Sequence, residues 1–260
     1  MIRKLMKYEF MATGRVFLPL FAALLIVSAV NRLFQNLDMN TPAVIGAILS
    51  VVLIVGILVL TLILTLQRFR NNLLSGEGYL MMTLPTRADG LILSKLFVAS
   101  IWNVASFIVV VIAIMIMALS GVDIPHIFSQ IRGLLNLISL PAIQLVLYIV
   151  EAIVLIALTL FAGILLLYTC MSLSMLVNKR RGLFTFGAYV VITTVMQTLF
   201  AVLVAISAAV SIYDVFSLSS LSMFGQIQVI VLLIILCEAI LCAVFYFITR
   251  FMLERRLNLQ

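Results

Sequence analysis

The sequence predicts an all-α polytopic membrane protein with six transmembrane helices, preceded by an N-terminal helix at the membrane surface. Hydrophobic residues make up 65% of the 260 residues and charged residues only 10%, whereas soluble domains are about half apolar and a quarter charged. Five apolar stretches reach 18 residues or more and a sixth is nearly as apolar, so each can cross a hydrocarbon core about 30 Å thick. We therefore read residues 1–260 as one transmembrane domain.

The basic residues alternate between the two sides of this predicted bundle. Only Arg32 and Arg132 fall on one side, and the other fourteen Lys and Arg residues fall on the opposite side. The positive-inside rule places the richer side, with both chain ends, in the cytoplasm, and this requires an even number of spans. The net charge of +7 is thus explained by topology and does not indicate a nucleic-acid partner.

The N-terminal residues 1–13 show an amphipathic pattern that predicts a helix lying on the inner leaflet. Four apolar residues share one helical face, namely Ile2, Leu5, Met6 and Phe10. Span one is expected over 15–34, with Pro19 near its first turn, where proline is tolerated best. Span two is expected over 43–66.

Residues 67–95 form the longest polar segment and separate spans two and three. The apolar patches 73–74 and 79–84 would be unusual in a disordered linker. Thr86 is expected to cap a new helix, because its hydroxyl can accept a hydrogen bond from a backbone N–H of the first turn. Asp89 follows three residues later, where a carboxylate stabilises the helix N-terminus. We expect an ordered amphipathic element on the cytoplasmic side that docks against another protein.

The rest of the chain, from residue 96 on, supplies the remaining predicted elements. Span three covers 96–119, and in the next segment, 120–141, apolar residues recur at helical spacing, which predicts an amphipathic helix on the outer face. Span four covers 142–177, longer than a bilayer requires, so it must tilt or project. The basic turn 178–181 then leads into span five.

Span five is expected over 183–211, where alanines recur every four residues, a pattern suited to close helix packing. The outer segment 212–225 is apolar enough to re-enter the membrane, and span six covers 226–248. Three cysteines lie inside apolar runs and are expected to fill the core without forming a disulfide: Cys170, Cys237 and Cys242.

The sequence contains no motif for an enzyme acting alone. His126 is the single histidine, and one histidine cannot form the usual metal-ligand cluster. A phosphate-binding loop of the G-x-x-x-x-G-K-[ST] type is also missing. We therefore expect a chain that is not an enzyme and carries no cofactor of its own.

Two carboxylates, Glu151 and Glu238, fall within the predicted spans four and six. A charge in mid-membrane costs about 2.5–3.5 kcal/mol on insertion scales, so such residues usually face a cavity or a polar partner. They are either translocation residues that attract a cation or proton, or structural groups hydrogen-bonded to a neighbouring helix. By their distance from the outer ends of their spans, they could lie at comparable depth.

The run LSGEGYL at 74–80, the run TLPT at 83–86 and the pair SK at 94–95 resemble the second-to-third cytoplasmic loop of type-2 ABC exporter permeases of the Gram-positive bacterial type. The six spans, the amphipathic N-terminal helix and the apolar outer segment before span six resemble this family too. The helix expected over 120–141 departs from the simplest pattern of the class.

The resemblance implies that the loop is a coupling helix docked on a separate ABC ATPase subunit. The implied contact residues are Glu77, Gly78, Tyr79, Leu80, Leu84, Pro85, Thr86 and Arg87, with Lys179 and Arg180 in a second, smaller contact. It also implies two ATPase copies that hold ATP and Mg²⁺, a second permease, identical or paralogous, and a bacterial cell membrane. A simpler alternative is that Arg68, Arg70 and Lys95 only hold anionic lipid headgroups.

Three functions follow for the chain. The first is an ATP-driven exporter subunit for a hydrophobic or amphipathic cargo such as a peptide, lipid or drug. The second is an ion-coupled secondary transporter or channel that uses Glu151 and Glu238. The third is a membrane scaffold or sensor subunit that transports nothing.

Overall fold

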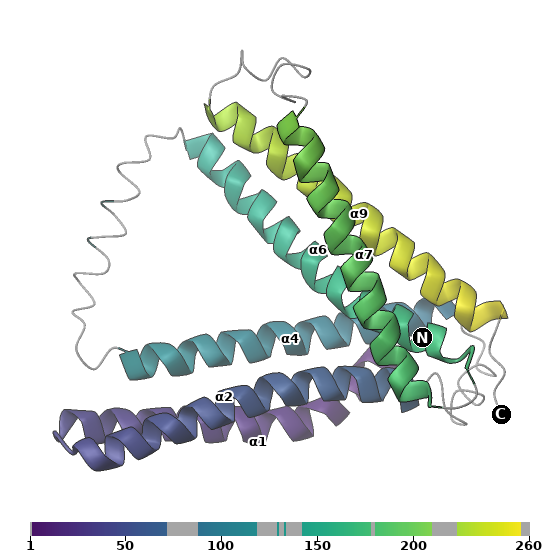
Figure 1. Ribbon diagram of the computed structural model, residues 1–260. Coiled ribbons are helices and arrows are strands. Elements are labelled where there is room, and N and C mark those ends of the chain that lie inside the picture. Colours follow the sequence, from purple (N-terminus) through teal and green to yellow (C-terminus); the bar gives the residue numbers. More distant parts are fainter. Residues whose placement is uncertain are drawn as a thin grey trace. The chain divides into compact units, whose positions relative to one another are not determined.

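Six helices, each long and apolar enough to cross a membrane, make up the described chain and confirm the predicted fold class. The computed structural model describes residues 2–71, 88–118, 129, 133, 142–177, 180–209 and 223–255, and no strand occurs among them. The helices are α1 (Ile2–Asn36), α2 (Asn40–Phe69), α4 (Ala88–Ala118), α6 (Ala142–Ser174), α7 (Arg181–Ala209) and α9 (Met223–Arg255) (Figure 1).

The chain divides into two compact units, each with three of these helices. The first unit contains residues 1–68 and 90–140, and so nearly all of α1, α2 and α4. The second contains residues 69–89 and 141–260, and so α6, α7 and α9.

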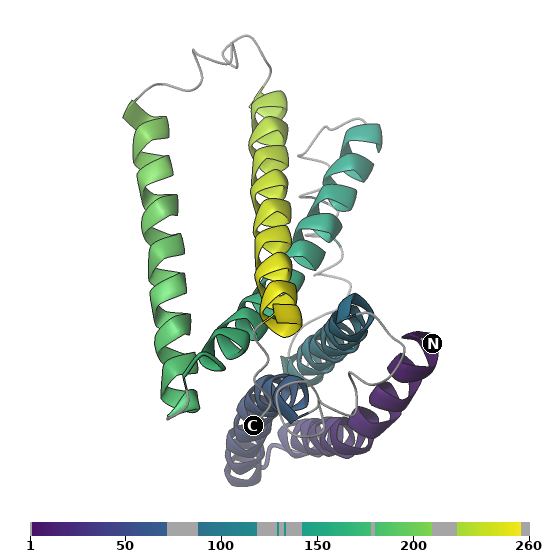
Figure 2. The ribbon, with the colours of Figure 1, turned by 90° about the vertical axis from the view of Figure 1, so that its right-hand side faces the viewer.

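In the first unit α1, α2 and α4 lie side by side in both views (Figures 1 and 2). Trp102 of α4 is 5% exposed, and its ring stacks on Phe10 and Phe17 of α1 with centroid distances of 4.9 and 5.0 Å. Thr61 of α2 and Ser106 of α4 form a hydroxyl contact of 3.0 Å. The buried apolar core comprises Phe17, Phe21, Leu24, Ile57, Val98, Trp102, Val110 and Ala113.

Small residues let α1 approach its two neighbours closely. A Cβ on Gly14 would lie 3.3 Å from the Trp102 ring. A Cβ on Gly46 of α2 would lie only 2.7 Å from Oδ1 of Asn31, which is fully buried in α1. A Cβ at Gly46 therefore forces a shift of Asn31, whereas a Cβ at Gly14 makes only a tight contact with the Trp102 ring. Small residues at such close approaches are common between membrane helices.

In the second unit α6 packs against α9 and α7. Thr169 of α6 places its hydroxyl 3.1 Å from the Thr249 hydroxyl and 3.1 Å from the Phe245 carbonyl, both on α9. Interhelical contacts of this kind stabilise membrane bundles by about 0.6 kcal/mol each on average.

The N-terminal segment differs from its prediction. Residues 2–13 are the first turns of α1, which continues without a break to Asn36, and no separate interfacial helix precedes the span. Two residues of the predicted apolar face pack on protein: Met6 contacts the core and Phe10 stacks on Trp102. Pro19 consequently lies in the middle of the helix, not in its first turn.

The connection between spans two and three is also shorter than the predicted polar segment 67–95. The helix α2 continues to Phe69, and α4 already begins at Ala88, with Asp89 in its first turn as expected. Lys95 is therefore a helical residue of α4. The predicted outer segments 120–141 and 212–225 lie almost entirely outside the described residues.

Smaller differences concern span four and the cysteines. The helix α6 ends at Ser174 and a turn follows, so its last predicted residues are not helical. All three cysteines are free as predicted, but only Cys170 is buried, whereas Cys237 is exposed and Cys242 is half-buried. The prediction that all three fill the core was wrong for Cys237, because its face of α9 meets no other described part of the chain.

Candidate functional site: a buried polar cluster of α1, α2 and α4

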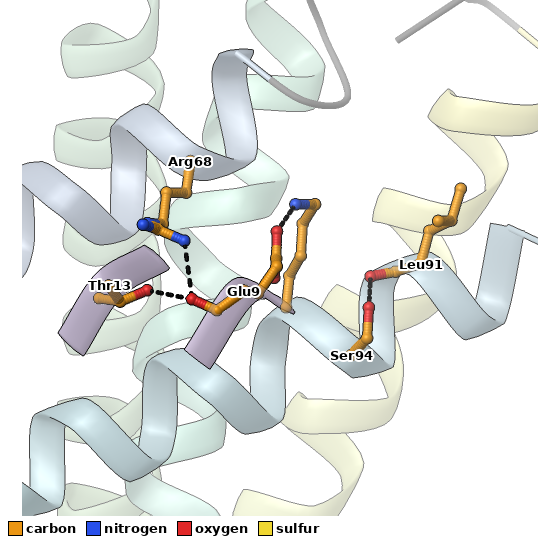
Figure 3. Close-up of polar contacts among 6 residues, drawn as sticks. Glu9, Thr13, Arg68, Leu91 and Ser94 are labelled. Carbon is orange, nitrogen blue, oxygen red and sulfur yellow. Dashed lines mark hydrogen bonds and ion pairs between the residues drawn. The ribbon is translucent and has the colours of Figure 1, made fainter. Parts of the chain in front are cut away.

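A buried polar cluster joins the first turns of α1 to the end of α2 and the beginning of α4. Its members are Glu9 and Thr13 of α1, Arg68 of α2 and Lys95 of α4 (Figure 3). Arg68 and Lys95 lie on the two helices that flank residues 72–87, the segment that carries most of the predicted coupling contact. The cluster belongs to the first unit.

The centre of the cluster is an ion pair between Glu9 and Lys95. The Lys95 ammonium donates to Oε1 of Glu9. Glu9 is 8% exposed and Lys95 is 3% exposed, so both charges are removed from solvent. An isolated buried charge would be strongly unfavourable, and the pair removes most of that cost for both groups.

The backbone carbonyl of Glu9 receives two further hydrogen bonds. Nη1 of Arg68 donates to it at 3.1 Å, and the hydroxyl of Thr13 donates at 2.7 Å. Figure 3 shows Arg68 and Thr13 both directed at this oxygen, while the Glu9 carboxylate points away from it. The Glu9 side chain thus binds α4, and the Glu9 backbone carbonyl binds α2.

The arrangement links three helices through one residue, Glu9. Charge-assisted hydrogen bonds are about twice as strong as neutral ones and have narrow geometry. A displacement of the start of α4 must either carry Glu9 with it or break the Glu9–Lys95 ion pair. A displacement of the end of α2 must likewise carry Glu9 or break the hydrogen bond from Arg68 to its carbonyl.

Lys95 corrects one prediction. A lysine that only held lipid headgroups would be exposed, but Lys95 is buried against Glu9. Arg70 is exposed and remains available to headgroups, whereas Arg68 is partly buried and bonded to the Glu9 carbonyl.

Most of the predicted coupling contact lies outside the described residues. This holds for Glu77, Gly78, Tyr79, Leu80, Leu84, Pro85, Thr86, Arg87 and Lys179. Arg180 is described: it is exposed, has a positive φ of 58°, and its carbonyl accepts a bond from the Phe184 N–H at 3.2 Å. It therefore caps the start of α7.

The two predicted translocation residues do not share a partner. Oε1 of Glu151 on α6 lies 3.5 Å from Nε2 of Gln228 on α9, and its Oε2 is buried with no hydrogen-bond partner among the described residues. Glu238 is half-buried on α9, ten residues beyond Gln228, or about 15 Å by helical rise. Among the described residues no three His, Cys, Asp or Glu side chains gather as a metal site would require.

Glu9 was missed by the sequence analysis, although a signal was present. It follows Met6 by three residues and Leu5 by four, and therefore lies on the apolar face of the N-terminal helix. An acidic residue on such a face indicates a buried cationic partner. Lys95 is likewise three residues before Val98 and seven before Trp102, both of which are buried.

Comparisons of the chain with protein-family models, with curated proteins and with solved structures find no match.

Proposed function

We propose that this chain is the membrane-spanning subunit of an ATP-driven exporter of the type-2 ABC class, in a bacterial cell membrane with both termini in the cytoplasm. In this proposal it has no nucleotide site of its own. Two copies of a separate ATPase subunit supply ATP hydrolysis, and a second permease, identical or paralogous, completes the translocation path.

One observation supports this proposal most: the polar cluster ties both helices that flank residues 72–87 to α1. An exporter subunit without fuel must receive movement from its partner and pass it to its spans. The segment 72–87 is suited to this role, because Arg68 and Lys95 join the two helices that flank it to α1. A partner that displaces the segment would therefore move three helices together. Packed helices that have two stable arrangements can convert such a displacement into opening or closing.

The proposed contact has buried anchors and a polar rim. Tyr79 and Leu84 would be the anchors, because aromatic and apolar side chains carry most of the energy in protein interfaces. Glu77 and Arg87 would contribute the rim. Lys179 and Arg180 would form the smaller second contact, and this part rests on the family resemblance alone.

The test is co-purification of the chain with its ATPase, followed by measurement of ATP hydrolysis in lipid nanodiscs. We expect Tyr79→Ala and Leu84→Asp to lose ATPase stimulation and to weaken co-purification, because each removes an anchor. Leu37→Asp is the matched control, since Leu37 is 67% exposed in the connection between α1 and α2. Unchanged stimulation in both anchor variants would rule out the coupling role of the segment.

A second candidate function, an ion-coupled transporter or channel, is favoured by one observation. Oε2 of Glu151 is buried without a hydrogen-bond partner among the described residues, as expected of a group that takes up a cation or proton in a transport cycle. Transport driven by a proton gradient without ATP, and abolished by Glu151→Gln, would support this function over the first.

A further inference from the structure

An apolar groove runs between the end of α6 and the beginning of α7, entirely within the second unit. Its volume is about 620 Å³, and eight nonpolar residues and one charged residue line it. The nonpolar residues include Leu173 and Val177 from the α6 side, and Phe184, Gly187 and Val191 from α7. The charged residue is Arg180, at the N-terminal end of α7.

The dimensions of the groove match one leaflet of a bilayer. From Arg180 to Ile192 the groove follows α7 for twelve residues, about 18 Å at 1.5 Å per residue. Half of a hydrocarbon core about 30 Å thick is about 15 Å. The volume also lies within the range of about 300–1,000 Å³ that is usual for small-molecule sites.

The charge of the groove lies at one end only. Arg180 and Arg181 stand where α7 begins, and the first turn of α7 contains no acidic residue. The partial positive charge of the helix N-terminus adds to the two guanidinium groups. An occupant that neutralises this end must therefore be anionic there and apolar along the rest of its length.

We propose that this groove binds a membrane phospholipid, with one acyl chain along Phe184, Gly187 and Val191 and an anionic headgroup paired with Arg180. The end of α7 that carries the basic residues is the end where headgroups of that leaflet lie, so charge and depth agree. Arg180 then pairs with a headgroup and not with an ATPase subunit, which replaces its role in the second contact proposed above.

Gly187 allows the groove to be filled without disturbing the fold. A Cβ at Gly187 would meet no atom within 4 Å, so Gly187→Leu introduces its side chain into open space. Gly163 of α6 is the matched control, because a Cβ there also meets no atom within 4 Å and Gly163 does not line the groove. Arg15→Gln is the control for charge, since Arg15 is an exposed arginine of α1.

The experiment measures lipid retained by the full chain after purification from mixed micelles with equal phosphatidylglycerol and phosphatidylcholine, counted by native mass spectrometry. We expect the wild type to retain phosphatidylglycerol preferentially. Arg180→Gln should reduce its retention about fivefold, the usual effect of one basic residue at an anionic membrane surface. Gly187→Leu should abolish the retention of both lipids, while Gly163→Leu and Arg15→Gln should match the wild type.

Three results would overturn the proposal. The first is equal retention of the two lipids by the wild type, and the second is unchanged lipid retention in Gly187→Leu. The third is a lipid-free dimer in detergent that Gly187→Leu converts to a monomer, since a second copy of the chain would then fill the groove.

Discussion

Removal of one partner of the Glu9–Lys95 ion pair should destabilise the first unit more than any other single change in the polar cluster. Glu9→Gln leaves the Lys95 ammonium buried, at 3% exposure, with no anionic partner on Glu9. Lys95→Met removes the ammonium group that pairs with the buried Glu9 carboxylate, while the nearby Arg68 guanidinium still attracts that carboxylate. The double variant Glu9→Leu with Lys95→Met leaves neither charge.

The expected magnitudes differ enough to be told apart. Breaking a buried ion pair from one side costs about 3–5 kcal/mol, whereas replacing both partners by apolar groups of similar size is often neutral or stabilising. The total stability of a folded protein is only about 5–15 kcal/mol. Arg68→Met should cost less, about 1.5–3 kcal/mol, because it removes one hydrogen bond from a charged donor to a carbonyl.

Trp102 provides the assay, because it is the single tryptophan of the chain and lies in the core of the first unit. Its ring stacks on Phe10, the neighbour of Glu9 in the sequence. Unfolding of the purified chain by a denaturing detergent, followed by tryptophan fluorescence, therefore reports directly on the helices that the cluster joins. Lys7→Met is the control, since Lys7 is exposed on the same part of α1.

The double variant decides the outcome. If its loss of stability equals the sum of the losses caused by Glu9→Leu and Lys95→Met when each is made alone, Glu9 and Lys95 act independently and the ion-pair argument is refuted. A loss below about 1 kcal/mol in Glu9→Gln alone would refute it as well, because a pair with that little effect is typical of exposed charges.

Two further predictions concern packing and accessibility. Gly46→Ala should destabilise the first unit by about 1–3 kcal/mol through overpacking against Asn31, and Asn31→Ala in the same chain should restore most of that loss; no rescue in the fluorescence assay would contradict the close approach. In mild detergent a small maleimide should modify Cys237, which is exposed, and spare Cys170, which is fully buried; mass spectrometry after digestion identifies the modified residue, and equal labelling of both would contradict the packing of α6.

The six spans could be predicted from the sequence because hydropathy alone determines them. A helix that crosses a bilayer needs about 20 apolar residues whatever its neighbours are, and each described helix contains such a window. The residue at which α2 ends and the residue at which α4 begins could not be predicted from hydropathy. Arg68 and Lys95 look like loop residues by composition. Their contacts with Glu9 explain why Arg68 is partly buried and Lys95 fully buried within helices.

The surroundings of the N-terminal part of α1 could not be predicted from the sequence pattern either. Met6 and Phe10 form an apolar face in either case, and a sequence pattern does not say whether that face meets lipid or protein. Phe10 meets protein, because it stacks on the ring of Trp102, which belongs to a helix nearly a hundred residues away in the sequence. The same limitation explains Cys237, whose apolar surroundings in the sequence are not matched by neighbours in the described chain.

The position of Pro19 has a consequence for how α1 moves. Proline lacks an N–H, so the carbonyl of Arg15 loses its helical donor, and the helix yields at this point more readily than elsewhere. Glu9 is anchored on one side of this joint and Asn31 is wedged against Gly46 on the other. We therefore expect a displacement of Glu9 to bend α1 at Pro19, while the half that contains Asn31 stays packed against α2.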